Sequence, residues 1–157
     1  VYIEGKALFM RHFYRDMGEN MPEGSDLRNK IESTDGIYSG LIILPFNNRD
    51  DAFEYLEGKG IPVDGLFANL VKKDKEHGIL YKITRPHMIH KFDEPYMGPP
   101  KVVDANAEPW DKDVLIGNGS DVTVKLNVWR GTKKSEIRWE GMRVDNLVEY
   151  HQEEAPF

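Results

Sequence analysis

The chain has 157 residues, of which 39% are hydrophobic and 31% are charged, a balance that is typical of one folded domain and excludes disorder throughout. It has no cysteine and no apolar run near the ~20 residues of a membrane-spanning helix, which excludes disulfide frameworks, thiolate metal sites, thiol nucleophiles and such a helix. The formal net charge of −6 would repel a polyanion if it were spread evenly, so the distribution of charge matters more than its sum.

The first half of the chain is predicted to hold two strands and two helices. Val1–Phe9 is rich in apolar and aromatic residues, and Gly36–Phe46 is apolar on both faces, which is typical of a strand covered on both sides. The polar stretch Met17–Asp35 between them is expected to be a loop. Asn48–Glu57 is predicted to be helical because acidic residues open it and glycines follow it, and Pro62–His77 carries apolar residues spaced for a second helix.

The second half is predicted to hold three more strands. Ile79–Thr84 alternates between two faces, and Phe92–Trp110 is expected to be a loop because it contains four prolines. Asp121–Trp129 places Val and Leu side chains on one face and polar residues with a tryptophan on the other, which predicts a half-buried strand. A basic turn leads to the last strand, Glu136–Tyr150, in which Gly141 marks a bulge.

This order of elements favours a mainly β fold. Strands without regular β-α alternation argue against a doubly wound parallel sheet. A five-stranded Greek-key barrel of the OB-fold (oligonucleotide-binding) type with a short helical insert fits the strand count. A β-sandwich with a helical insert is the alternative.

The basic residues gather in the strand segments, while the acidic ones collect in loops and toward the C-terminus. Lys6–Arg15 holds three bases and no acid, Lys72–Lys91 six bases against two acids, and Asp121–Arg143 six against three. Aromatic rings stand beside these bases, as in the pair Trp129 and Arg130. Single-stranded nucleic acid requires both features, because phosphates need cations along a groove and unpaired bases need flat rings.

The candidate binding residues are therefore rings and cations on these strands. Trp129 is the strongest aromatic candidate, because the alternation places it opposite the Val and Leu face. A ring on a strand is more often part of the core, which is expected for Trp139. The same packing role is expected for Tyr2, Phe9, Tyr38 and Phe53. The candidates for stacking bases are Tyr14, Tyr81 and Trp129, and those for phosphates are Arg11, Arg15, Lys82, Arg85, Lys125, Arg130 and Arg138.

Signals for catalysis or metal binding are weak. A metal site could use His87, His90, Asp93 and Glu94, but the histidines lack i, i+4 spacing and the glutamate of the zincin signature is missing. The glycine-rich run Ile116–Ser120 is followed by a strand rather than a helix, so it is no phosphate-binding loop. We therefore expect no enzyme activity, no cofactor and no metal.

The last third of the chain resembles a known family. A Val-Val-Asp step at Val102–Asp104 precedes a polar loop and the run Asp113–Ser120. An alternating strand, a basic turn and a final strand ending at Val144–Glu149 follow. This order resembles the single-stranded-DNA-binding proteins of short-tailed T-odd phages and marine podoviruses. The resemblance implies an OB-type barrel at residues 1–150 and sequence-independent, non-catalytic DNA binding in phage replication and recombination.

The resemblance also implies partners and a place of action. Family members carry an acidic C-terminal tail ending in an aromatic residue, which contacts the phage DNA polymerase and primase-helicase and supports a homodimer. Residues 151–157 hold Glu153, Glu154 and Phe157 but far less acid than such a tail, which fits a trimmed or reduced one. The chain begins with Val1, which fits a numbering that starts inside a longer protein. No secretory signal is visible, and the family would act in the host cell cytoplasm, away from membranes.

Two other readings remain open. One is a phage structural or protein-interaction β-domain, whose basic strands would have no ligand. The other is a metal-dependent nuclease that uses the histidine and carboxylate group at positions 87–94.

Overall fold

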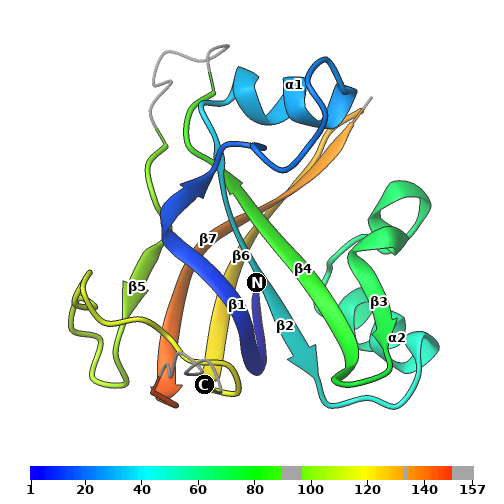
Figure 1. The fold of residues 1–157 in the computed structure, drawn as a ribbon. Helices are drawn as coiled ribbons and strands as arrows, with labels where there is room; N and C mark the ends of the chain where they lie inside the picture. Colours follow the sequence, from blue (N-terminus) through cyan, green and yellow to red (C-terminus); the bar gives the residue numbers. More distant parts are fainter. Residues whose placement is uncertain (90–96, 133, 150–157) are drawn as a thin grey trace, which may run out of the picture.

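The computed structural model describes residues 1–89, 97–132 and 134–149. They form one seven-stranded sheet in the order β3-β4-β2-β1-β6-β7-β5, so the prediction of a mainly β fold is confirmed (Figure 1). Neighbouring strands are antiparallel except β5 and β7, which are parallel. The strands are β1 Tyr2–Asp16, β2 Ile37–Leu44, β3 Val71–Asp74, β4 Gly78–Pro86, β5 Lys101–Val103, β6 Asp121–Arg130 and β7 Ser135–Asn146.

Two α-helices and one 3-10 helix flank the sheet: α1 Asp26–Ser33, α2 Arg49–Gly58 and η1 Gly65–Leu70. α2 lies where the acidic first turn predicted a helix, and the Asn48 side chain caps it by accepting from the Asp51 amide at 2.9 Å. In α1 the Ser25 side chain plays this part. None of the helices in the described ranges is long and apolar enough to cross a membrane.

β1 is the strand on which the sheet bends. Its first residues pair with β6 and its later residues with β2, and Lys6 pairs with both Ile43 and Asp121. The sheet curves so far that β4 approaches β7, which is not its neighbour in the strand order. The Arg85 guanidinium on β4 donates to the Trp139 carbonyl on β7 at 3.3 Å across this approach.

The core lies inside the curved sheet. On β6, Val122, Val124 and Leu126 are buried, as the alternation predicted. Trp139 on β7 is fully buried, which confirms its predicted place in the core. Leu56 of α2 belongs to the same apolar cluster, so α2 closes part of this interior.

Several predicted boundaries are wrong, because the short elements depend on tertiary pairing. The sheet has seven strands rather than five, and the two added ones, β3 and β5, are its edges. Pro62–His77 is not one helix but η1 followed by β3, because Val71 is buried and pairs with Tyr81 on β4. β1 runs well beyond the predicted end at Phe9, and the expected loop Met17–Asp35 contains α1.

The predicted bulge at Gly141 is confirmed. Lys125 pairs with Gly141 and the next residue, Leu126, pairs with Trp139, which leaves Glu140 as the extra residue of β7. A Cβ atom at position 141 would lie 2.7 Å from the Lys101 carbonyl oxygen. Glycine therefore allows the close approach of β5.

Candidate nucleic-acid interface

The far end of β1 carries exposed cations beside an exposed ring. Tyr14 is 49% exposed, and the Arg11 guanidinium carbon lies 5.1 Å from the centre of its ring. Arg15 is exposed as well, whereas Arg11 is half-buried and forms an ion pair with Asp16 at 3.5 Å. We call Arg11, Tyr14 and Arg15 the β1 cluster. It offers a flat face and positive charge within five residues, which is the combination that single-stranded nucleic acid needs.

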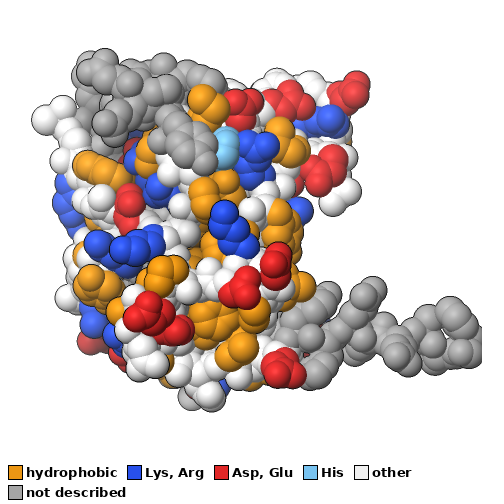
Figure 2. Space-filling view, turned by 90° about the vertical axis from the view of Figure 1, so that its left-hand side faces the viewer, with side chains coloured by type: hydrophobic (Ala, Val, Ile, Leu, Met, Phe, Trp, Pro, Cys, Tyr) orange, Lys and Arg blue, Asp and Glu red, His pale blue; other side chains and the backbone are white. Residues whose placement is uncertain are grey.

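The side of the molecule that carries β1 and β5 has a mixed surface. Figure 2 shows Lys and Arg side chains among hydrophobic ones across the middle of this side. Asp and Glu side chains gather mainly below that band and at its upper right. Although the chain has a negative net charge, its charges are unevenly distributed, and part of this side is locally positive.

His87, just after β4, adds little positive charge at neutral pH. Its burial, and next the charge of Arg15, lower the pKa of this imidazole. Its Nδ1 atom is hydrogen-bonded to the Tyr38 hydroxyl at 2.7 Å.

Trp129 lies on the outer face of β6, as the alternation predicted, and is 41% exposed. The guanidinium carbon of Arg138 on β7 lies 4.5 Å from the centre of its ring. Since Arg138 covers one face of the indole, a nucleobase would have to stack on the other face.

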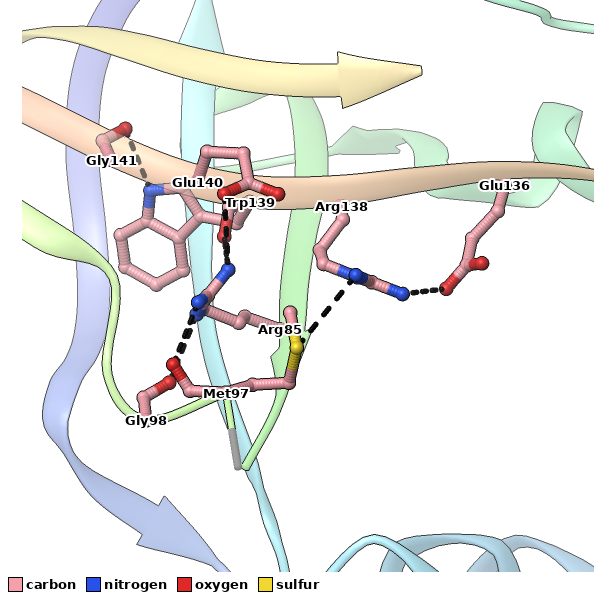
Figure 3. A network of polar contacts seen from close by, with 8 residues as sticks. All are labelled: Arg85, Met97, Gly98, Glu136, Arg138, Trp139, Glu140 and Gly141. Atoms are coloured by element: carbon pink, nitrogen blue, oxygen red, sulfur yellow. Dashed lines mark hydrogen bonds and ion pairs between the residues drawn. The ribbon is translucent and has the colours of Figure 1, made fainter. Parts of the chain in front are cut away.

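Two of the predicted phosphate contacts are buried arginines, and for these the prediction is wrong. Arg85 donates to the carbonyls of Met97 at 2.8 Å and Gly98 at 2.9 Å and pairs with Glu140 at 3.4 Å (Figure 3). Burial lowers the pKa of Arg85, and Glu140 acts in the opposite direction. Its donors are used to join the segment after β4 to β7 rather than to meet a ligand.

Arg138 is likewise only 7% exposed. One of its nitrogens lies 2.9 Å from the Glu136 carboxylate, and another lies 3.9 Å from the Met97 sulfur (Figure 3). Its guanidinium is therefore a support under Trp129, not an open phosphate site.

Tyr81 is also wrongly predicted as a stacking residue. It is 1% exposed, and burial raises the pKa of its hydroxyl. Ile79, Tyr81 and Ile83 share one inward face of β4, so the predicted alternation places Tyr81 with the two isoleucines in the core.

The remaining cations, Lys82, Lys125 and Arg130, are exposed but lie apart from the β1 cluster. Lys82 is on β4, and β2 separates it from β1. Lys125 pairs with Tyr2 at the opposite end of β1, and Arg130 donates to the Gly60 carbonyl at 3.0 Å. The structure therefore does not gather them with the β1 cluster, and their phosphate contacts stay predictions.

No group of three or more His, Asp or Glu residues that could hold a metal ion occurs within the described ranges. Of the alternative metal site, only His87 is described; His90, Asp93 and Glu94 lie outside the described residues. Residues 151–157, the predicted tail segment, lie outside them as well.

Phe9 lies at the surface, although it was expected to pack in the interior. Its side chain is 61% exposed, and its backbone φ is 51°. Tyr2 is also exposed, at 57%, whereas Tyr38 is buried as predicted. The only signal for Phe9 is that the apolar run around it does not alternate as a regular strand would.

The fold is similar to that of solved phage proteins, although the sequence itself has no match. No family model matches the sequence, and no curated protein matches it. The structure is similar to gp2.5, a single-stranded DNA binding protein encoded by bacteriophage T7, with 15% identity, a TM-score of 0.53 and coverage of 94% of this chain and 92% of that chain. It is also similar to the single-stranded DNA-binding protein from bacteriophage Enc34 in complex with single-stranded DNA, with 10% identity, a TM-score of 0.54 and coverage of 96% and 89%. The predicted resemblance to phage proteins of this kind is thus confirmed at the level of the fold.

Proposed function

We propose that the chain binds single-stranded DNA without sequence preference and without catalysis, during phage DNA replication and recombination in the host cell cytoplasm. The β1 cluster carries the proposal, since it sets an exposed ring beside two arginines on a fold shared with two phage proteins named for this activity. The ring would stack a base, and the arginines would meet the adjacent phosphates.

We further propose that the five long strands, β1, β2, β4, β6 and β7, form an OB-type barrel of the Greek-key kind. Two observations support it. β1 is shared between β2 and β6, and β4 comes close to β7, where a barrel would close. In this arrangement the short strands β3 and β5 extend its rim.

Trp129 is the proposed second stacking position. Its exposed face lies on the outer side of the β6–β7 pair, and Arg138 beneath it fixes the ring and adds positive charge. Lys82, Lys125 and Arg130 would meet phosphates of a strand that continues beyond the β1 cluster.

The domain assignment and the protein partners are part of the same proposal. Residues 1–150 would form the DNA-binding domain. Residues 151–157 would belong to a tail that contacts the phage DNA polymerase and primase-helicase and supports a homodimer, as the family resemblance implies.

Titration with oligo-dT tests the DNA-binding proposal, with tryptophan fluorescence as the signal. We expect binding that weakens steeply as salt rises, because phosphate contacts release counterions, and much weaker binding to a duplex. Arg15→Ala is expected to reduce the slope of log K against log salt by about 0.7, the value for one phosphate contact on a single strand. Lys73→Ala removes the same charge from the edge strand β3 and serves as the matched control.

The ring is tested in the same assay. Tyr14→Ala is expected to cost roughly 1–3 kcal/mol of binding free energy, the value of one stacked base. Tyr2→Ala removes an equally exposed tyrosine at the other end of β1 and should change little. Absence of oligo-dT binding at low salt would refute the proposal in favour of a structural or protein-interaction domain. DNA cleavage that needs Mg²⁺ or Mn²⁺ and stops with a chelator would favour the nuclease.

A further inference from the structure

Phe9 combines an exposed ring with a backbone conformation that bulky residues avoid. Its φ is 51°, in the left-handed region, and 61% of its surface is exposed. A large apolar side chain gains nothing from water contact, and the left-handed backbone adds a cost. Such strain persists only where the surrounding structure enforces it, and it concentrates at binding sites.

A β-bulge and one side chain enforce this conformation. The pairing of β1 with β2 shifts register between Leu8 and Arg11, which places Phe9 in the irregular segment. The Phe9 amide donates to the Asn118 side-chain oxygen at 2.8 Å. Asn118 thus supplies a side-chain partner for a backbone amide inside the bulge.

The glycine-rich segment Ile116–Ser120 is fixed to β1 beside the bulge. The Ala7 amide donates to the Ser120 carbonyl, and the Gly119 amide donates to the Ala7 carbonyl, both at 2.8 Å. Asn118 therefore reaches Phe9 from a segment that is itself hydrogen-bonded to the same strand.

The other side of this segment is held by the chain after β7. The Gly117 amide donates to the Val148 carbonyl at 2.9 Å, and the buried Ser120 hydroxyl accepts from the Val148 amide at 2.8 Å. A Cβ atom at position 117 would lie 2.2 Å from the Val148 oxygen, so the contact requires glycine. The glycine-rich run Ile116–Ser120 is thus hydrogen-bonded to β1 on one side and to the chain after β7 on the other, and we call it the brace.

We propose that Phe9 is a further stacking residue for the bases of single-stranded DNA and that Asn118 is its positioning residue; this rests on the proposed function. Arg11 follows Phe9 by two residues and supplies a cation for the adjacent phosphate. Phe9 and Tyr14 are both exposed and lie five residues apart on β1, which is at most roughly 18 Å even for a fully extended chain. The pairing of β1 with β2 shifts register on both sides of Arg11, so this part of β1 is not a regular strand. A DNA strand that runs along β1 would pass both rings.

Phe9→Gly removes the aromatic ring without destabilising the fold, because glycine adopts a positive φ without strain. We expect this variant to unfold at the same or a higher urea concentration and to bind oligo-dT roughly five- to 150-fold more weakly, as for one lost stacked base. Phe9→Tyr keeps the ring and should bind within about twofold of the parent. The salt slope of Phe9→Gly should equal that of the parent, because the ring contacts no phosphate.

The role of Asn118 is tested by a double-mutant cycle. Asn118→Ala should weaken oligo-dT binding while Phe9 is present and have no further effect in the Phe9→Gly chain, because a positioning residue acts only through the group that it positions. Equal losses in both backgrounds would overturn that role.

The outcomes separate this inference from the proposed function. If the parent binds oligo-dT and Phe9→Gly binds equally well, the inference is overturned while the function stands. A parent chain that fails to bind overturns both. A concentration-dependent dimer that Phe9→Gly abolishes, with DNA affinity unchanged, would assign Phe9 to self-association and also overturn the inference.

Discussion

Acid should destabilise this protein through one buried histidine. His12 on β1 is 1% exposed, with its ring centre 4.3 Å from that of Phe13. Burial lowers the pKa of His12 from its ordinary value of 6.5 to about 4. The imidazole is therefore neutral in the folded chain at pH 7.

The direction of the effect follows from that lowered pKa. The unfolded chain takes up a proton near pH 6.5, while the folded chain resists it until about pH 4. The contribution of His12 to stability is therefore complete above pH 6.5 and is lost as the pH falls toward 4. Between pH 7 and pH 5 this proton linkage amounts to roughly 2 kcal/mol of the free energy of unfolding.

Urea unfolding at pH 7 and pH 5, followed by tryptophan fluorescence, measures this loss. His12→Leu removes the titrating group and keeps an apolar side chain of suitable size. The parent should lose roughly 2 kcal/mol more than this variant between the two pH values. His77→Gln, at a partly exposed histidine, is the control and should behave like the parent. Equal losses in parent and His12→Leu would refute the reasoning.

Three further predictions concern the core, the candidate site and the brace. Tyr81→Phe removes a buried hydroxyl that has no hydrogen-bond partner among the described residues, so it should change stability by less than about 1 kcal/mol in urea and leave oligo-dT affinity unchanged. Trp129→Ala should cost less than about 1.5 kcal/mol of stability, since the ring is partly exposed, yet weaken oligo-dT binding in a filter assay. Gly117→Ala should lower stability by about 2 kcal/mol or more, because the added Cβ meets the Val148 carbonyl, as a shifted urea midpoint would show.

The long strands could be predicted because apolar and polar residues alternate along a strand that is buried on one face and exposed on the other. β6 shows this most clearly, with Val124 inside and Trp129 outside. Gly141 was also predictable, since a glycine within a strand often marks a bulge. The edges β3 and β5 were missed, because their few residues become strands only by pairing with β4 and β7.

The candidate site was harder to predict, because a basic side chain is exposed or buried according to which backbone segments, distant in the sequence, pack against it. Arg85 is buried because its guanidinium donates to the carbonyls of Met97 and Gly98. The pattern of apolar and polar residues in β4 does not predict these hydrogen bonds. Arg138 is held by Trp129 and Met97 in a similar way. The exposure of Phe9 was not predicted because it depends on a bulge in the pairing of β1 with β2 and on Asn118, which lies 109 residues later in the chain.

The bend of β1 has a consequence for how this protein is made. Tyr2, near the start of the chain, pairs with Lys125, so the first strand cannot be completed until β6 has left the ribosome. Contacts between such distant parts of a chain also slow folding. In a nascent chain that stops before residue 121, the residues Tyr2–Lys6 of β1 would lack their β6 partners and form an unpaired edge, available to chaperones or to a second chain.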